Sequence, residues 1–304
     1  MIKCIKKGFI YCPNNKDAWN NNSFMTPSAT LINNSTIRIF GGIRDDEGKS
    51  RISYIDVNAE NPKEIIQIAE QPVADLGKPG CFDDNGMILG SVLKLKDEIR
   101  LYYIGFQLVK QVKFLAFSGL AYFKGDNVIR HSDSPIMDRY NSETYIRAIH
   151  TVLYEDGIYK IWYSTGNKWE IIDNIPYPQY KINYAESIDG IIINNETIVE
   201  CIDVRDREYR IGRPVVFKHD GLYKMFYTSD TLEKKYTPGY AESLDGRIWE
   251  RKDHLMLLTV SDNGWDSEMV CYPFPLFYKD RCYVFYNGNG MGKTGVGYAE
   301  IYFR

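Results

Sequence analysis

The stretches YKIWYSTG at residues 159–166 and YKMFYTSD at residues 223–230 decide the fold, because the chain carries the same pattern in five places. Each stretch alternates in the way a β-strand does and ends in turn residues. The other copies are IRIFGG (37–42), IRLYYIG (99–105) and CYVFYNGN (282–289). An anchor aromatic recurs in the copies at intervals of 63, 60, 64 and 59 residues, as Phe40, Tyr103, Tyr163, Tyr227 and Tyr286.

Each anchor strand lies between two further strand-like segments. An apolar run precedes it, as in AIHTVLY (148–154), and another alternating segment follows it, as in KINYAESIDG (181–190) and PGYAESLDG (238–246). No segment shows a helical apolar period over a dozen residues, so the pattern favours an all-β chain. Five such sheets arranged radially form a β-propeller, and a pair of packed sheets, a β-sandwich, is the alternative.

We therefore predict an all-β, five-bladed β-propeller that occupies residues 1–304 as a single domain, with a repeat of about 60 residues. The last repeat ends at Arg304 and leaves little room for a fourth strand. The segment from Ile5 to Tyr11 is expected to complete the last blade.

Composition narrows the class of protein. Hydrophobic residues make up 44% of the 304 residues and charged residues 25%, which suits a globular core, and the formal net charge is -3. That charge provides no basic field for nucleic acid. The sequence has no apolar run long enough to span a membrane, and no signal peptide follows the early lysines, so a cytoplasmic location is expected. The six scattered cysteines are expected to be thiols, and the oligomeric state stays open.

The geometry of a propeller places a site before any motif is considered. The first strand of each blade lines the central channel, and the start of that strand shares a face with the loop between the second and third strands. Carboxylates near these positions suggest acid/base chemistry on a glycosidic bond. The candidate catalytic residues are Asp84, Glu268, Glu143 and Asp83.

Roles follow from the surroundings that the sequence indicates. Adjacent residues of an extended strand point to opposite sides, so only one of Asp83 and Asp84 can face the channel, and we favour Asp84 as base or nucleophile. Glu268 is the better general acid, because Trp265 and its apolar neighbours would raise its pKa. The candidate substrate-binding residues on the same face are Arg44, Asp45, Arg147, Trp169, Arg210, Arg213, Trp265, Asp266, Asn287, Asn289 and Lys293.

Other motifs are interpreted as structural. Glu186 and Glu242 occupy equivalent YAES segments, and a catalytic group is usually needed once, so both are left out of the site. The segment NGNGMGKT (287–294) is similar to a phosphate-binding loop, but it lacks the first glycine and the following helix, so it is read as a wide hairpin whose Asn and Lys face the pocket. The histidines lack metal-ligand spacing, so no metal is predicted, although carboxylates could hold calcium in the channel.

The five blades, the segment CFDDNGMILGSVL (81–93), the repeated YAESxDG segments and the C-terminal stretch 265–300 resemble the five-bladed propeller superfamily of glycoside hydrolases. That superfamily includes families 43, 32, 62 and 68 and the family 130 mannoside phosphorylases. The sequence is most similar to poorly characterised relatives associated with bacterial surface-polysaccharide biosynthesis. The resemblance implies essential carboxylates at the axis, here Asp83 or Asp84 with Glu143 and Glu268, and usually no organic cofactor.

The leading hypothesis is a glycan-active enzyme that cleaves or transfers a glycosyl unit of a carbohydrate or sugar nucleotide, in surface-polysaccharide or nucleotide-sugar metabolism. One alternative is a phosphorylase or glycosyltransferase, which needs a cationic cluster such as Arg44, Arg147, Arg210, Arg213 and Lys293. Another is a carbohydrate-binding propeller without catalysis. A protein-interaction platform is a third, although the repeat signatures of that class are missing.

Overall fold

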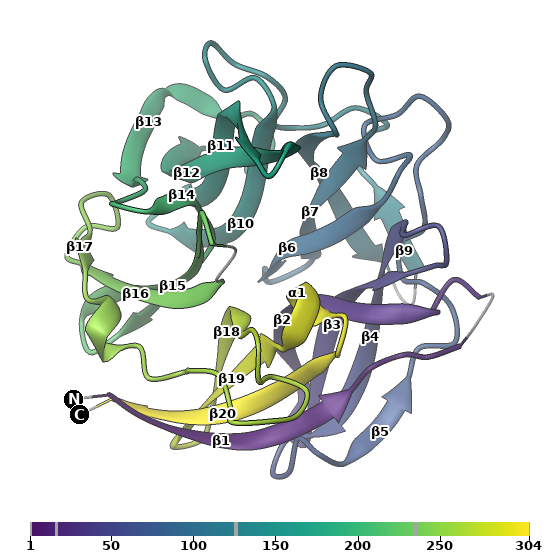
Figure 1. Cartoon of the computed structure of the whole chain (residues 1–304), viewed down its shortest axis with the longest axis vertical. Helices are drawn as coiled ribbons and strands as arrows, with labels where there is room; N and C mark the ends of the chain where they lie inside the picture. The colour runs from purple at the N-terminus through teal and green to yellow at the C-terminus, as the bar shows by residue number, and fades with distance from the viewer. Residues whose placement is uncertain (1, 16–17, 125–126, 234–235, 304) are drawn as a thin grey trace.

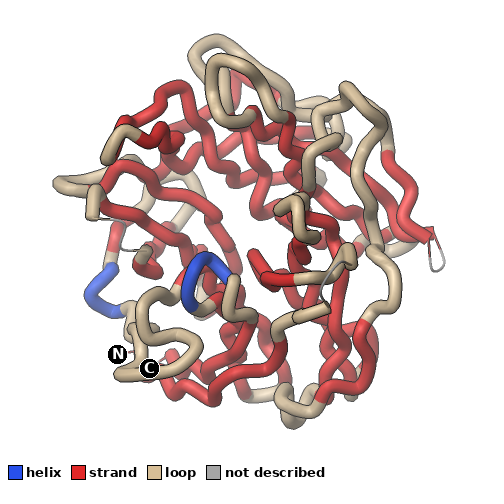
Figure 2. Tube along the Cα trace, turned by 45° about the vertical axis from the view of Figure 1, so that its right-hand side comes forward, coloured by secondary structure: helices blue, strands red, loops and turns tan. Residues whose placement is uncertain are grey.

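The computed structural model describes residues 2–15, 18–124, 127–233 and 236–303. Nearly all of its regular structure is β, with one short 3₁₀ helix (η1, Asp253–Leu255) and one helical turn (α1, Asn289–Gly292) (Figure 2). The strands form a ring of antiparallel units that follow one another in chain order (Figure 1). The predicted all-β propeller is confirmed.

The strand pairing fits five blades of four strands each. Blade 1 contains β2 (Asn22–Asn33), β3 (Thr36–Arg44), β4 (Ser50–Asn58) and β5 (Ile65–Ile68). Blade 2 contains β6 (Met87–Lys94), β7 (Ile99–Gln107), β8 (Leu115–Lys124) and β9 (Asn127–Arg130). Blade 3 contains β10 (Ile146–Glu155), β11 (Ile158–Ile172), β12 (Ile175–Ser187) and β13 (Asn194–Ile202).

Blade 4 contains β14 (Glu208–His219), β15 (Leu222–Thr231), β16 (Thr237–Ser243) and β17 (Glu250–Arg251). Blade 5 contains β18 (Cys271–Tyr278), β19 (Arg281–Asn287), β20 (Val296–Phe303) and β1 (Ile2–Tyr11). Blades 2 and 3 share one sheet of eight strands, because Ile146 and Arg147 of β10 pair in parallel with Ala116 and Phe117 of β8.

The N-terminal strand belongs to the C-terminal blade. β1 runs antiparallel to β20, from the pair Ile2 and Phe303 to the pair Tyr11 and Val296. The ring is therefore closed by hydrogen bonds between the two ends of the described chain, which removes an open sheet edge.

Apolar side chains between neighbouring blades hold the ring together. Five of the buried clusters each combine residues of two adjacent blades, and together they run around the whole ring. The anchor aromatics lie on the second strand of each blade and are at most 1% exposed. The first strands β2, β6, β10, β14 and β18 contact one another in sequence, and β18 contacts β2. The repeat period thus encodes both the blades and their packing.

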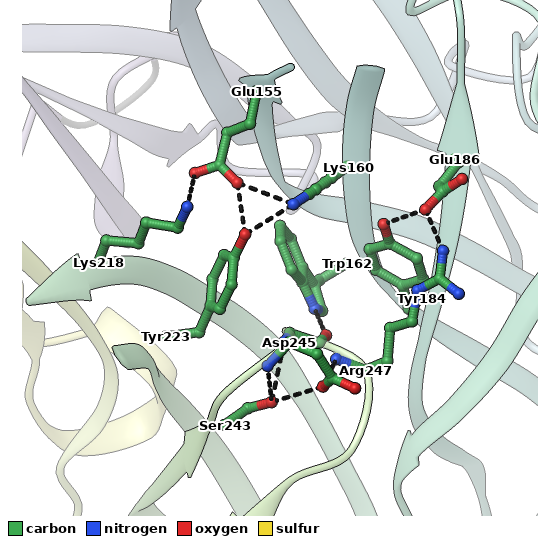
Figure 3. A network of polar contacts seen from close by, with 11 residues as sticks. Glu155, Lys160, Trp162, Tyr184, Glu186, Lys218, Tyr223, Ser243, Asp245 and Arg247 are labelled. Carbon is green, nitrogen blue, oxygen red and sulfur yellow. Dashed lines mark hydrogen bonds and ion pairs between the residues drawn. The ribbon is translucent and has the colours of Figure 1, made fainter. Parts of the chain in front are cut away.

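The repeated YAESxDG segments join neighbouring blades. In the blade-4 copy, the carbonyl oxygen of Gly246 accepts a hydrogen bond from Trp162 Nε1 of blade 3 at 2.7 Å (Figure 3). The next residue, Arg247, forms an ion pair with Glu186 of blade 3. In blade 3, Tyr102 of blade 2 donates in the same way to Gly190 at 3.0 Å. Gly190 and Gly246 have φ of 73° and 78°, which glycine adopts readily. The interpretation of these segments as structural is consistent with these contacts.

Candidate functional site

All five blades line a cavity of about 380 Å³, which we call the axial pocket. Every first strand contributes to its lining, through Met25 of β2, Ile88 of β6, His150 of β10, Arg213 of β14 and Tyr272 of β18. Loops and second strands add the outer wall. The pocket therefore lies on the axis of the ring, where the propeller geometry places a site.

A β-bulge interrupts the first strand of each blade near its start. Bulges turn individual side chains out of the regular pleat. In three blades the bulge holds a residue in the left-handed region, with φ of 53° at Thr26, 54° at Arg213 and 57° at Tyr272. All three precede a proline and line the axial pocket. Backbone strain of this kind costs about 1–3 kcal/mol per residue and is concentrated at functional sites.

The lining combines positive charge with aromatic rings. The cations are Arg44, Lys113, Arg210 and Arg213, and the tyrosines are Tyr177, Tyr180, Tyr236 and Tyr272. Among the described residues that line the pocket there is no Asp and no Glu. The electrostatic character of the axial pocket is thus the opposite of the carboxylate-lined channel that the sequence resemblance implied.

Arg213 is the most buried of these cations, at 4% exposure. Its Nη2 donates to the carbonyl oxygen of Thr26 at 2.8 Å and its Nη1 to that of Leu89 at 3.2 Å, so it ties blade 4 to blades 1 and 2. Burial lowers the pKa of Arg213 to about 10, and no ion pair to a described carboxylate offsets that burial. The guanidinium remains charged at neutral pH and leaves net positive charge at the axis.

Arg210 is held differently, by an acid behind the pocket. Its Nη2 lies 2.7 Å from Asp230 Oδ2, and the Tyr209 hydroxyl donates to the same oxygen at 2.5 Å. The rings of Tyr177, Tyr180, Tyr209 and Tyr236 surround the guanidinium, with centroids 4.8–6.0 Å away. Burial alone would lower the pKa of Arg210, but Tyr180, Tyr236, Tyr209 and Asp230 raise it.

Arg44 ends β3 and is the half-buried cation of the pocket. Its guanidinium forms no ion pair or hydrogen bond with another described residue, and its buried Nε has no partner. Burial lowers the pKa of Arg44. Because its charge is not matched by the protein, Arg44 is the side chain best placed to meet a bound anion.

His150, on β10, lies beside Arg213 of β14 in the axial pocket and is 7% exposed. Its Nδ1 has no hydrogen-bond partner among the described residues. Burial, together with the charge of Arg213, holds the pKa of His150 well below its ordinary value of 6.5. The folded chain therefore keeps this imidazole neutral at a pH where the unfolded chain protonates it.

We expect this histidine to make the protein sensitive to acid. Below pH 6.5 the unfolded state binds the proton and the folded state does not, so the free energy of unfolding falls as the pH falls, by at most about 1.4 kcal/mol per pH unit. The stabilisation is fully present above that pH. Urea unfolding between pH 5 and 7.5 should show a shallower pH dependence for His150→Asn than for the wild type, and equal slopes would contradict the assignment.

The predicted acids are not brought together at the axis. Asp83, Glu143 and Asp266 each accept a hydrogen bond from the anchor tyrosine that lies 20 residues later in the sequence, at 3.2, 2.8 and 2.9 Å. Each also pairs with a base, namely Arg130, Arg147 and Lys6, at 2.9, 2.6 and 2.7 Å. The same arrangement in three blades indicates a structural role. Of these acids, only Glu143 lines a cavity described below.

The expected choice between the two adjacent aspartates is also corrected. Asp83 is the buried member, at 1% exposure, whereas Asp84 is half-buried and accepts a hydrogen bond from the Gly80 amide at 2.8 Å. Neither lines the axial pocket. The segment before β6 forms a turn and not an extended strand, so strand alternation does not apply to it.

Glu268 does not lie at the axis either. Its side chain is exposed, and its backbone amide donates to Asn289 Oδ1 at 2.8 Å. Trp265, which was expected to enclose it, packs instead against Tyr286, with ring centroids 5.1 Å apart. The apolar surroundings that would make Glu268 a general acid are therefore absent from this part of the described structure.

Of the remaining candidates, Asn287, Asp45 and Trp169 contact neighbouring residues of the fold, and Lys293 lies on the surface. Asn287 is fully buried and accepts a hydrogen bond from the Thr26 amide at 2.6 Å, which helps to hold the strained residue in place. Asp45 pairs with Arg51 at 2.7 Å, and Trp169 packs on Phe114, a residue of the axial pocket, with ring centroids 5.4 Å apart. Lys293 is exposed and does not line the pocket, contrary to expectation.

Sequence reasoning therefore placed Arg44, Arg210 and Arg213 at the site and missed His150 and the tyrosines. One signal was available. The dipeptides Thr26-Pro27, Arg213-Pro214 and Tyr272-Pro273 occupy equivalent places in three blades, and the residue before each proline faces the axis. Within the described residues, no three His, Cys, Asp or Glu side chains gather as a metal site, and no helix has the length and apolarity to cross a bilayer.

Comparison with known proteins agrees with the fold. No protein-family model matches the chain. Two uncharacterized proteins from the Mycobacterium tuberculosis strains CDC 1551 and H37Rv are each 28% identical over 298 residues, which covers 97% of this chain and 98% of theirs.

Solved structures match over nearly the whole ring. A glycosyl hydrolase from Bacteroides ovatus has a TM-score of 0.68 at 17% identity, covering 99% of this chain and 90% of its own. A thermostable family-43 glycoside hydrolase has a TM-score of 0.62 at 15% identity and coverages of 95% and 92%. A GH43_1 enzyme from Xanthomonas citri complexed with xylotriose has a TM-score of 0.59 at 14% identity and coverages of 93% and 87%. The fold of this chain is thus the propeller fold found in these glycoside hydrolases.

Proposed function

We propose that this chain is a glycan-active protein that binds an anionic glycosyl substrate in the axial pocket and transfers the glycosyl unit to or from a phosphate-bearing group. One observation carries the proposal. Arg44 and Arg213 both line the pocket without a carboxylate partner, and the described lining contains no acid. The likeness in fold to glycoside hydrolases supports a carbohydrate as the substrate.

The electrostatics favour a negatively charged ligand. A buried guanidinium without a counter-charge is unfavourable, and a phosphate or carboxylate placed beside it forms charge-assisted hydrogen bonds in a medium of low dielectric constant. The tyrosine rings around Arg210 provide apolar faces for a sugar ring. Burial raises the pKa of Tyr236 and Tyr272, so their hydroxyls remain protonated and can donate hydrogen bonds to the ligand.

Hydrolysis by a carboxylate pair has less support. That mechanism places two carboxyl groups about 5–9.5 Å apart on either side of the scissile bond. Transfer involving phosphate needs positive charge instead, because cations hold the phosphate oxygens while the bond from the anomeric carbon to its leaving oxygen breaks and a bond to the incoming oxygen forms. When phosphate attacks, its own acidic proton passes to the leaving sugar oxygen, and in the reverse direction the proton of the attacking hydroxyl passes to the departing phosphate. Inorganic phosphate, a sugar phosphate and a nucleotide sugar from cytoplasmic surface-polysaccharide synthesis share this chemistry.

A carbohydrate-binding propeller without catalysis is the second candidate. The same lining favours it, because acid/base catalysis needs a titratable group beside the substrate and the described lining offers His150 but no carboxylate. Such a protein would bind the anionic glycan and release it unchanged.

One screen separates these functions. The protein is incubated with nitrophenyl glycosides, sugar 1-phosphates and UDP-sugars, with and without inorganic phosphate, and the products are analysed by mass spectrometry. We expect glycosyl transfer only when a phosphate or a phosphorylated donor is present. Binding of anionic sugars without turnover would identify the binding protein, and phosphate-independent hydrolysis of a neutral glycoside would refute the proposal.

A further inference from the structure

A second cavity lies beside the axial pocket in blade 3. We call it the blade-3 pocket; it holds about 440 Å³ between the loop at residues 140–143 and the β11–β12 hairpin. β12 forms the wall between the two cavities. Pro178 and Tyr180 line the axial pocket, whereas Gln179, Lys181 and Asn183 line the blade-3 pocket. Successive side chains of a strand point to opposite faces, so one strand serves both cavities.

Tyr180 lines both cavities, which makes them neighbours and not separate sites. Its ring packs over Gly212, where an added Cβ would lie 2.6 Å from the ring. A β-bulge between Thr165 and Lys168 turns Gly166 and Asn167 toward the blade-3 pocket. A side chain at Gly166 would approach the Gln179 carbonyl oxygen to 2.7 Å, so the glycine keeps the wall close.

The blade-3 pocket differs from the axial pocket in charge. Its charged lining residues are already ion-paired: Glu143 with Arg147 at 2.6 Å, and Lys181 with Asp203 at 3.8 Å and with Glu200. Lys181 is shared by two acids, so these pairs leave a small excess of negative charge, which disfavours an anion. A ligand in this cavity is therefore expected to be uncharged, in contrast to the ligand of the axial pocket.

The remaining lining offers hydrogen bonds that the protein does not use. The side chains of Asn141, Asn167, Gln179 and Thr165 form no hydrogen bond with other described residues. Tyr140 adds an aromatic ring at 36% exposure. Amides can donate and accept at once, as sugar hydroxyls require, and an aromatic ring suits the apolar face of a sugar.

Asn183 adds an independent sign of a ligand site. It is 6% exposed, its Nδ2 donates to Glu143 Oε1 at 2.8 Å, and its buried Oδ1 has no hydrogen-bond partner among the described residues. A buried acceptor without a partner is unfavourable, and a turn of the Asn183 side chain that exposed Oδ1 to a ligand hydroxyl in the cavity would remove the penalty. Glu143 thus acts in this cavity as the residue that positions Asn183.

We propose that the blade-3 pocket is a second saccharide site that takes an uncharged sugar unit of the glycan whose anionic unit occupies the axial pocket. The continuity of the two units rests on the proposed function, whereas the neutral site itself rests only on the contacts around Asn183 and Gln179. Tyr180 would contact both units. The substrate class is then an oligosaccharide of at least two units, one charged and one neutral.

Saturation-transfer NMR with glucose, galactose, mannose and xylose as probes tests the neutral site. We expect at least one probe to bind the wild type, and Asn167→Ala/Gln179→Ala to weaken its binding at least fivefold. Gln67→Ala, in the exposed edge strand β5, and Arg44→Met, in the axial pocket, should leave that binding unchanged. Ten millimolar phosphate should not compete. Thermal melting confirms that the variants fold.

The proposal fails if no neutral probe binds, if the double variant binds as the wild type does, or if Arg44→Met abolishes the signal. The first two outcomes do not depend on the axial pocket, which is tested with anionic probes, and the third would place the neutral probe in the axial pocket. If the wild type bound a neutral sugar but no anionic probe, the proposed function would be refuted and the second saccharide site would stand.

Discussion

Replacing Arg44 by methionine should weaken the binding of phosphate, sugar 1-phosphates and UDP-sugars by about tenfold to a hundredfold. The reason is that the Arg44 guanidinium has no carboxylate or hydrogen-bond partner among the described residues, so its charge and its N–H donors are available to a ligand anion. One charge-assisted hydrogen bond is worth about 1.5–3 kcal/mol. Isothermal titration of the wild type and the variant measures the difference.

Arg205→Met is the matched control, because it removes the same charge from an exposed loop before β14. It should bind anions as the wild type does, and Arg44→Lys should keep part of the affinity. Asp84→Asn and Glu268→Gln, which alter acids outside the axial pocket, should also leave binding unchanged. Equal affinities for Arg44→Met and Arg205→Met would show that the anion does not meet Arg44.

Replacing Asp83 by asparagine should lower the free energy of unfolding by about 3 kcal/mol. Asp83 is 1% exposed, pairs with Arg130 at 2.9 Å and accepts a hydrogen bond from Tyr103 at 3.2 Å, so the substitution leaves the half-buried Arg130 without its counter-charge. Removing one member of a buried pair typically costs about 3–5 kcal/mol, and Arg130, at 27% side-chain exposure, keeps the expected value at the lower end. Urea unfolding followed by tryptophan fluorescence measures the loss.

The neighbouring substitution Asp84→Asn is the control, since it changes one hydrogen bond to the Gly80 amide and should cost less than about 1 kcal/mol. The contrast separates a structural acid from a catalytic one. If Asp83→Asn were as stable as the wild type but lost turnover, Asp83 would be a catalytic group after all.

The fold was accessible from the sequence because each blade repeats the same local pattern. The anchor aromatics mark the second strand of every blade, and they are buried between blades in each copy. A repeat of that kind needs no long-range information, since neighbouring units bury the same faces. The sharing of one sheet by blades 2 and 3 could not be predicted, because it depends on two residue pairs between β8 and β10.

The site was accessible only in part. Arg210 and Arg213 lie near the start of the first strand of blade 4 and Arg44 lies at the end of the second strand of blade 1, and the propeller geometry places both positions on the face of the axial pocket. Asp83, Glu143 and Asp266 each lie 20 residues before an anchor tyrosine, and this repeated spacing marks a structural contact within each blade. The side chains that reach the axis depend on bulges in the first strands, and a strict period of two cannot locate a bulge.

A crystal structure of the wild-type protein soaked separately with inorganic phosphate and with UDP-glucose tests the central claim most directly. The account predicts that phosphate oxygens lie within hydrogen-bonding distance of the Arg44 guanidinium in the axial pocket, beside Arg210 and its ring of tyrosines. An anion bound only outside the axial pocket, or a neutral glycan held between Asp83 and Glu268, would contradict it.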